Sequence, residues 1–136
     1  GLVLAEETTA ANESDIKHLE TPLKKANLPK KTLVYADKGY DSAENKEVLA
    51  RMKLKSHIMH KGTRAHKITE REKRINMAIS KIRYRVERTF GSIHRWFGGG
   101  TARYVGLAKT HAQHIMEAVA YNLYRTPGII VSNTLK

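Results

Sequence analysis

The longest regular pattern of apolar residues in the chain lies between Ile75 and Phe97 and predicts one amphipathic helix. Apolar side chains recur there in steps of three and four, which place them on one helical face: Ile75, Ile79, Ile82, Val86, Phe90, Ile93 and Phe97. Thr69 and Glu72 have the spacing of a capping box ahead of this helix, and Gly98 to Gly100 end it. We therefore expect a long helix with one packed face.

Shorter patterns predict strands and helices in alternation along the rest of the chain. Apolar and β-branched runs predict three strands, at Leu2–Thr9, Thr32–Ala36 and Ser56–Met59. The second of these is continuously apolar, as expected of a central, buried strand. Helix-start residues and apolar spacing predict three further helices: from Asn12–Asp15 to Asn27–Leu28–Pro29 with an interruption at Pro22, from Asp41–Ser42 to about Met52, and from Thr110 to Thr126–Pro127–Gly128.

The element order β-α-β-α-β-α-α predicts an α/β domain in which helices pack on a mixed sheet. The 136 residues are enough for one domain with a hydrophobic core and too few for two ordinary domains. No apolar run approaches the roughly 20 residues that span a membrane. Cysteine is absent, which excludes disulfides and thiolate metal sites and fits a reducing cytoplasm.

The formal charge of +12 is concentrated in the middle of the chain. Residues 51–104 contain 15 of the 25 Lys and Arg residues and only three acidic residues, so this region alone carries a net +12. A basic region beside nearly neutral flanks is typical of proteins that bind nucleic-acid phosphates. A solubilising or ribosome-like basic surface is the alternative interpretation.

Two acidic residues are candidate metal ligands. Asp37 follows the second predicted strand, and the carboxyl ends of strands border the functional crevice of α/β sheets. On the long helix, Glu87 shares a stripe about 40° wide with Arg83 and His94. Taken singly, Asp37 is equally an ordinary strand end, and Glu87 an ordinary surface partner of Arg83. Together they suggest a shared site for Mg²⁺, which prefers hard oxygen ligands.

The histidines and aromatic residues suggest structural roles. The sequence has no HExxH pattern, and its close histidine pairs are not supported by cysteine, so we expect no zinc site. Packing explains the large aromatic residues near the glycines and on the last helix better than base stacking does: Trp96, Phe97, Tyr121 and Tyr124.

Two ordered blocks resemble those of bacterial insertion-sequence DDE transposases. Residues 35–45 (YADKGYDSAEN) resemble the block around that family's second catalytic aspartate. Residues 83–98 (RYRVERTFGSIHRWFG) resemble its signature around the catalytic glutamate, in which an arginine stands four residues before the glutamate and a lysine seven after it. Arg83 matches that arginine, whereas His94 stands where lysine is usual. Residues 106–111 and 121–123 resemble the family's C-terminal end, so the resemblance covers nearly the whole chain.

The resemblance implies an RNase H-like mixed sheet flanked by helices, and DNA transposition on transposon-end and target double-stranded DNA. It implies cleavage and strand transfer with Mg²⁺ or Mn²⁺ held by an Asp-Asp-Glu triad. Asp37 is then the second acid and Glu87 the third, and both bind metal. Arg83 orients Glu87 or contacts phosphate, His94 takes the lysine's part in positioning DNA, and Tyr40 positions the acid or the DNA. Basic residues of the long helix bind DNA: Lys81, Arg85, Arg88 and Arg95.

The first acid of that triad has no counterpart in the sequence. In the family it precedes the segment that Gly1–Leu4 resembles, whereas Asn12–Asp15 resembles a helix start. We therefore expect residues 1–136 to be a single domain, the C-terminal part of a catalytic domain without its first strand. We expect this part to be inactive alone, and to act in the bacterial cytoplasm at the nucleoid, as a homodimer with the full-length transposase.

Two other functions stay open on the sequence alone. A DNA-binding remnant without catalysis would keep the cationic surface. An unrelated basic RNA-binding domain would explain the charge but not both acid-bearing blocks. The transposase hypothesis requires the carboxylates of Asp37 and Glu87 to lie within about 8 Å, close enough to share metal ions.

Overall fold

The computed structural model describes residues 1–134, apart from the side chain of Asp15. The chain forms two compact units, which are described separately. The sheet unit comprises Ser14–Tyr84, and the helical unit comprises Gly1–Glu13 and Arg85–Lys136. Within residues 1–134, no helix combines the length and the apolar character needed to cross a membrane.

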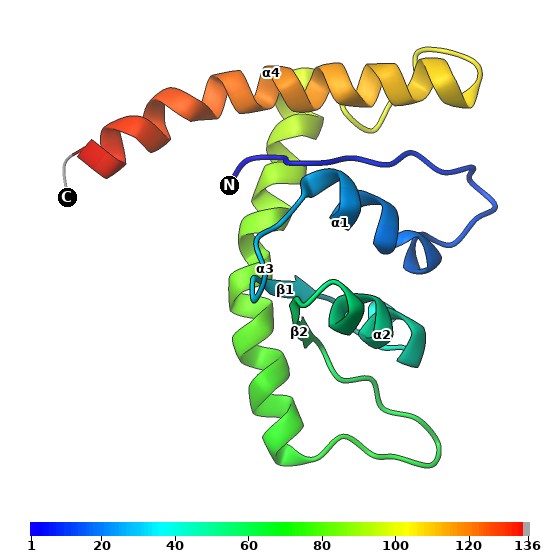
Figure 1. The fold of residues 1–136 in the computed structure, drawn as a ribbon. Helices are drawn as coiled ribbons and strands as arrows, with labels where there is room; N and C mark the ends of the chain where they lie inside the picture. The colour runs from blue at the N-terminus through cyan, green and yellow to red at the C-terminus, as the bar shows by residue number, and fades with distance from the viewer. Residues whose placement is uncertain (135–136) are drawn as a thin grey trace. The chain divides into compact units, whose positions relative to one another are not determined.

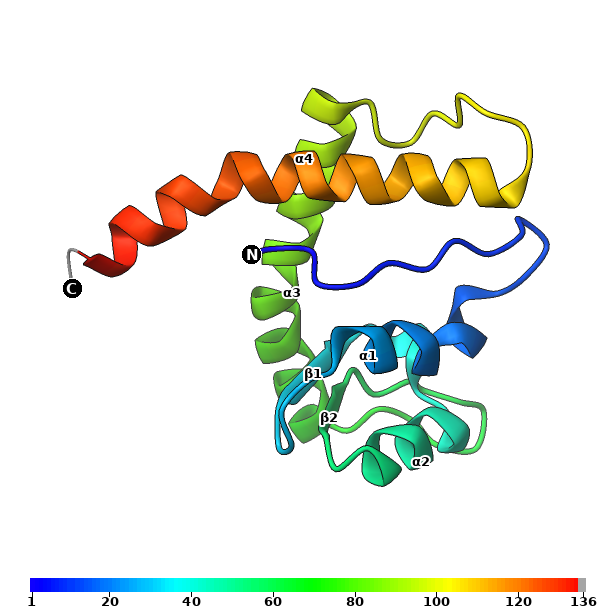
Figure 2. The same cartoon turned by 45° about the horizontal axis from the view of Figure 1, so that its top comes forward.

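The sheet unit contains two parallel strands joined through a helix. β1 (Leu33–Ala36) and β2 (Lys55–Ile58) pair with Ala36 opposite Ile58, and α2 (Ala43–Arg51) connects them (Figure 2). Both strands confirm the predictions to within one residue. The expected central position of β1 is wrong, because among the described residues β1 pairs with β2 alone and Leu33 is 43% exposed.

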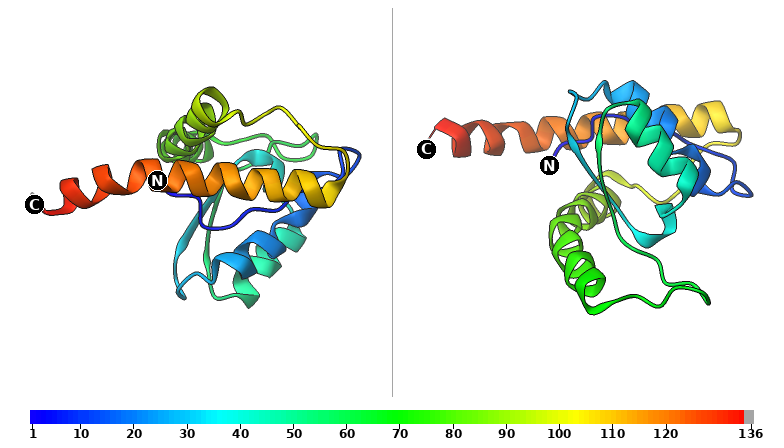
Figure 3. Two further views of the ribbon diagram at one scale, coloured as in Figure 1. Left: turned by 90° about the horizontal axis from the view of Figure 1, so that it is seen from above. Right: turned by 60° about the horizontal axis from the view of Figure 1, so that its bottom comes forward.

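Two helices cover the sheet and form its hydrophobic core. The predicted first helix is present as a 3₁₀ turn, η1 (Asp15–His18), followed by α1 (Glu20–Ala26), but the interruption lies at Leu19 and Pro22 stands inside α1, so its predicted place at Pro22 is wrong. It ends at Asn27, whose φ of 45° is left-handed. α1 and α2 lie side by side next to the two strands (Figure 3). Buried residues of these helices, of the strands and of the segment before β2 form one cluster: Leu23, Leu49, Ala36, Ile58 and Leu54.

Asn45 links the elements around the end of β1. Ser42 caps α2, as predicted, by accepting a hydrogen bond of 3.2 Å from the backbone N–H of Asn45. The Asn45 side chain is buried, and its amide donates to the carbonyls of Ile16 (3.2 Å) and Tyr40 (3.1 Å). One side chain therefore ties η1 and the turn after β1 to α2.

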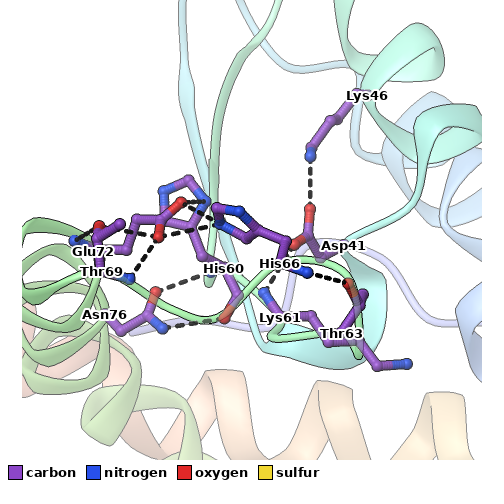
Figure 4. Close-up of polar contacts among 9 residues, drawn as sticks. All are labelled: Asp41, Lys46, His60, Lys61, Thr63, His66, Thr69, Glu72 and Asn76. Atoms are coloured by element: carbon purple, nitrogen blue, oxygen red, sulfur yellow. Dashed lines mark hydrogen bonds and ion pairs between the residues drawn. The ribbon is translucent and has the colours of Figure 1, made fainter.

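The capping box at the start of α3 (Glu70–Phe97) is confirmed (Figure 4). Thr69 Oγ1 accepts from the Glu72 N–H at 3.2 Å, and Glu72 Oε2 accepts from the Thr69 N–H at 2.8 Å. His66 Nε2 lies 3.1 Å from Glu72 Oε1. The hydrogen bonds from the backbone N–H and the hydroxyl of Thr69, with His66, lower the pKa of Glu72 from 4.5 to about 2.

α3 ends where the glycines predict, but little of its apolar face is buried. Its last residue is Phe97, and Gly98 follows with a left-handed φ of 75°. Ile79 is 3% exposed, whereas Phe90 is 65% exposed. The helix prediction is therefore confirmed, whereas the described elements cover only part of the predicted face.

The helical unit pairs α4 (Leu107–Thr134) with an irregular N-terminal segment (Figure 1). The predicted strand at Leu2–Thr9 is wrong, because residues 1–10 contain no regular element. Asn122 accepts from the Val3 N–H at 2.8 Å and donates to the Val3 carbonyl at 2.7 Å, taking the place of a strand partner. Thr8 Oγ1 lies 3.0 Å from Nδ1 of His114, so the segment runs along α4 in the opposite direction.

Both predicted ends of the last helix are wrong. α4 begins at Leu107, and Thr110 lies inside its first turns, where its N–H donates to the carbonyl of Gly106 at 3.1 Å. The helix also continues through Pro127 to Thr134. A proline removes one N–H donor, but later residues can resume the hydrogen-bond pattern, so Pro-Gly does not end this helix.

The aromatic residues near the end of α3 divide into packed and exposed ones. Tyr121 is 3% exposed and contacts Phe97 edge-on, with ring centroids 6.3 Å apart, as the packing interpretation predicts. Trp96 is 65% exposed, so the prediction that it packs in the core is wrong, whereas Tyr124, though 67% exposed, packs against the Phe97 ring with centroids 6.0 Å apart.

The capping box predicts a pH-dependent contribution to stability. The folded state keeps Glu72 charged below pH 4.5, where the unfolded chain takes up a proton. The stabilisation is therefore complete above pH 4.5 and is lost as the pH falls towards about 2. Glu72→Gln should lower the urea midpoint at pH 7, and the difference from wild type should shrink over that window. Glu70→Gln, in the same helical turn, is the control, and a difference that is independent of pH would contradict the assignment.

The buried hydrogen bonds of Asn45 predict a larger contribution to the free energy of unfolding, which does not depend on pH. Asn45→Ala leaves the carbonyl of Ile16 in η1 and that of Tyr40 in the turn after β1 without their donor, so it should lower the free energy of unfolding by about 2 kcal/mol. Glu47→Ala changes an exposed residue of the same helix and should stay within about 0.5 kcal/mol of wild type. Equal urea midpoints for the two variants would show that Asn45 does not hold the turn.

Candidate active site

Asp37 lies directly after β1 and its carboxylate is held in one orientation. It caps a 3₁₀ turn, η2 (Lys38–Tyr40), and its Oδ1 accepts from the Gly39 N–H at 2.7 Å. A Cβ at position 39 would lie 2.9 Å from that oxygen, so glycine permits the close approach. The Asp37 side chain is 44% exposed, so the carboxylate remains partly open to solvent.

Arg83 is the basic partner of Asp37. Its Nη2 lies 3.8 Å from Asp37 Oδ2, and its Nη1 lies 4.0 Å from the sulfur of Met59, the residue after β2. The Arg83 side chain is 24% exposed, so it stands at the edge of the sheet unit. The structure therefore places the guanidinium beside the second of the predicted acids.

The neighbouring Asp41 has a structural role that distinguishes it from Asp37. Its side chain is 12% exposed, forms an ion pair with Lys46 and accepts from the Lys61 N–H at 2.8 Å (Figure 4). Burial works to raise the pKa of Asp41, but Lys46 and Lys61 hold it below its ordinary value. Both carboxylates have a partner on each oxygen, but the Asp41 side chain is 12% exposed and the Asp37 side chain is 44% exposed.

Tyr40 contributes to the turn rather than to its exposed edge. Its side chain packs against the hydrophobic cluster of the sheet unit, and its carbonyl accepts from Asn45. Asn45, which the sequence identified only as a helix-start residue, is therefore the support of the turn that presents Asp37. Its position three residues after a Ser cap gave no signal of the two longer-range hydrogen bonds.

Glu87 and His94 belong to the helical unit. Glu87 is exposed on α3, and its side chain makes no hydrogen bond or ion pair to the described residues. The ordinary pairing of Arg83 with Glu87, one of the two interpretations of that acid, is therefore not formed. His94 contacts the glycine turn, because a Cβ at Gly100 would lie 2.6 Å from its ring.

His94 also borders a cavity of ≈ 530 Å³ that contains carboxylates. Glu117 is buried there and accepts from the side-chain amide of Gln113 at 2.7 Å. Burial raises the pKa of Glu6 above its ordinary value, while His114, 3.7 Å away, opposes that shift. The sequence gave no sign of this cluster, because Glu6 and Glu117 are brought together only by the packing of residues 1–13 along α4.

The predicted DNA-binding residues are exposed cations of α3. Lys81 lies in the sheet unit and the three arginines lie in the helical unit. Neither Arg85 nor Arg88 has an acidic partner among the described residues. Arg95 places its guanidinium 5.0 Å from the centre of the Trp96 ring.

The donors suit a hard divalent cation, but the described residues do not form a complete metal site. Within residues 1–134, no three His, Asp or Glu side chains gather in a group that could hold an ion. Asp37 nevertheless offers a partly exposed carboxylate, and Glu87 an exposed one. Mg²⁺ accepts such ligands singly or in pairs and completes its shell with water and phosphate oxygens.

Comparison with known proteins identifies the family. Residues 1–123 match the family described as "Transposase DDE domain". The chain is 45% identical over 117 residues to the "Transposase for insertion sequence element IS1106" of Neisseria meningitidis serogroup B. That match covers 86% of this chain and 40% of the relative, so the chain spans less than half of the relative's length. No solved structure matches the chain significantly.

The mixed α/β architecture, with parallel strands and flanking helices, is compatible with the RNase H-like fold that the sequence suggested. The match covers both acid-bearing blocks and extends into α4. The chain therefore belongs to the DDE transposases of bacterial insertion sequences.

Proposed function

We propose that this chain is part of the catalytic domain of a transposase that cuts and joins DNA strands at transposon ends with Mg²⁺ or Mn²⁺. The observation that carries the proposal is the carboxylate of Asp37, which Gly39 fixes at the end of β1, which lies 3.8 Å from Arg83, and whose side chain is 44% exposed. Membership of the transposase family supports the reaction class. Asp37 serves as the second acid and Glu87 as the third.

In this proposal, the two acids bind metal and the nearby cationic side chains bind phosphate. Asp37 and Glu87 would hold the divalent ions, which would supply activation of a water or 3′-hydroxyl and stabilisation of the leaving oxygen. The Arg83 guanidinium, 3.8 Å from Asp37, is placed to hold a phosphate oxygen in the same region. Tyr40 and Asn45 keep the turn of Asp37 in place.

The exposed cations of α3 bind the DNA backbone. Phosphate contacts of this kind supply affinity that falls with salt, and they fix the position of the strand without reading its sequence. Lys81, Arg85, Arg88 and Arg95 take this role, and His94 positions the strand next to the third acid. In this proposal, the protein acts on double-stranded transposon ends in the bacterial cytoplasm.

A second candidate is DNA binding without catalysis. It is favoured by the absence, within residues 1–134, of a group of three metal-binding side chains, together with a net charge of +12. In this alternative, Asp37 only orders its turn and Glu87 is a surface residue. Both candidates predict DNA binding, so they differ only in strand transfer.

A hybrid enzyme tests the proposal. The upstream part of the Neisseria relative is joined to this chain, and Mg²⁺-dependent strand transfer is measured on DNA that carries the relative's insertion-sequence ends. We expect transfer by the hybrid, and a loss of at least about a hundredfold with Asp37→Asn or Glu87→Gln, because each removes several kcal/mol of charge stabilisation.

Glu47→Gln is the matched control, because it removes an exposed carboxylate of α2 outside the proposed site. It should leave strand transfer unchanged. Equal transfer by the wild-type hybrid and its Glu87→Gln variant would reject the assignment of Glu87. A folded hybrid that binds the ends but transfers no strand would favour the binding-only alternative.

A further inference from the structure

A second, cationic cavity lies in the helical unit, between the second half of α3 and α4. Its volume is ≈ 450 Å³, within the usual range of small-ligand pockets. Its walls carry three arginines and two exposed aromatic rings: Arg85, Arg88, Arg125, Trp96 and Tyr124. The sequence predicted DNA contacts for Arg85 and Arg88, but gave no role to Arg125 and a packing role to the two rings.

The three guanidinium groups lack a counter-charge. None makes a hydrogen bond or ion pair to the described residues, and no described acidic residue lines the cavity. Like charges that converge without an acid repel one another, and a bound anion would relieve that repulsion. Arginine is suited to this task because its planar fork can hold two oxygens of one phosphate.

Three hydroxyl groups that line the cavity are already engaged within the protein. Thr89 Oγ1 donates to the Arg85 carbonyl at 3.1 Å, and Ser92 Oγ donates to the Arg88 carbonyl at 2.8 Å. The Tyr121 hydroxyl lies 3.1 Å from Thr89 Oγ1 and donates to it. The donors that remain for a ligand include the three guanidinium groups, whose positive charge favours an anion over a neutral polar molecule.

The aromatic rings add a second kind of contact. Trp96 and Tyr124 are each about two-thirds exposed, at 65% and 67%. Each ring is supported on one side, Trp96 by the Arg95 guanidinium at 5.0 Å and Tyr124 by the Phe97 ring at 6.0 Å. Supported, open aromatic rings beside arginines are the usual composition of sites for single-stranded nucleic acid, in which bases stack on the rings.

We propose that this cavity binds an unpaired nucleotide of a DNA strand, with its phosphate held by Arg85, Arg88 and Arg125 and its base stacked on Trp96 and Tyr124. Duplex DNA would satisfy the arginines but keeps its bases stacked inside the helix. The rings therefore favour the single strand. This inference rests on the proposed function only for the choice of DNA as ligand, since it needs neither metal nor the two acids.

Intrinsic fluorescence tests the proposal directly, because Trp96 is the single tryptophan of the chain. The chain is titrated in EDTA with an oligothymidylate of about 12 nucleotides, a length suited to single-strand sites. We expect saturable quenching of Trp96. An abasic strand of the same length and a duplex should bind, as measured by anisotropy, with little quenching. Equal quenching by the abasic strand, or binding of the oligothymidylate without quenching, would overturn the stacking.

Substitutions distinguish a specific binding site in the cavity from non-specific electrostatic attraction of DNA. Trp96→Ala should weaken binding about tenfold, the loss expected for one stacked base. Arg125→Gln should also weaken it and lower the slope of log affinity against log salt by about 0.7. Arg74→Gln changes an exposed arginine of α3 outside the cavity and should alter neither. Equal losses for Arg74→Gln and Arg125→Gln would reject the cavity as the site.

The same titration distinguishes this proposal from that of catalysis. Asp37→Asn and Glu87→Gln should keep the quenching, because neither residue lines the cavity. If the hybrid transfers strands but the oligothymidylate does not quench Trp96, the proposed nucleotide site in the cavity is rejected and the catalytic assignment is not. If the oligothymidylate quenches Trp96 of a hybrid that transfers no strand, the catalytic assignment is rejected and the nucleotide site is not.

Discussion

The parallel pairing of β1 with β2 determines where the chain presents its clearest acid. The Lys55 N–H donates to the Thr32 carbonyl at 2.9 Å, and the Met59 N–H donates to the Ala36 carbonyl at 3.0 Å, so the pairing extends to the last residue before Asp37. There the chain leaves the sheet, and the Asp37 carboxylate accepts a hydrogen bond from the Gly39 N–H. The same pairing places Met59 beside the end of β1, and Met59 contacts Arg83. Strand register thus brings an acid and an arginine together.

A parallel pair needs a crossover connection, and here that connection also supports the turn. α2 provides the crossover, Leu49 anchors it in the core at 1% exposure, and Asn45 ties it to the turn after β1. Packing and hydrogen bonding therefore act on the same few residues. The cations of α3 face solvent by contrast, which is the arrangement that a phosphate backbone can reach.

Local chemistry explains which features the sequence could predict. The Ser42 cap, the Thr69–Glu72 box and the stop at Gly98 act within one helical turn, so the ends that they define are where the sequence placed them. Asp37 and its glycine were likewise recognisable from one short block. The family was recognisable for the same reason, since its two blocks are contiguous.

Contacts between distant residues explain what the sequence could not predict. Alternating residues at Leu2–Thr9 suggested a strand, but the Asn122 side chain takes the backbone groups of Val3. The exposure of Trp96 depends on how α3 and α4 pack within the helical unit. The meeting of Arg125 with Arg85, forty residues earlier in the chain, depends on the same packing. None of these has a local pattern.

The central proposal is that Asp37 and Glu87 act together as ligands of divalent metal ions. The most direct measurement is a titration of the ¹⁵N-labelled chain with Mn²⁺, a paramagnetic ion that oxygen ligands accept in place of Mg²⁺. The account predicts that the amide signals beside Asp37 and beside Glu87 broaden at the same Mn²⁺ concentration. It also predicts that Asp37→Asn or Glu87→Gln abolishes the broadening at both places. Broadening at one acid that survives substitution of the other would contradict it.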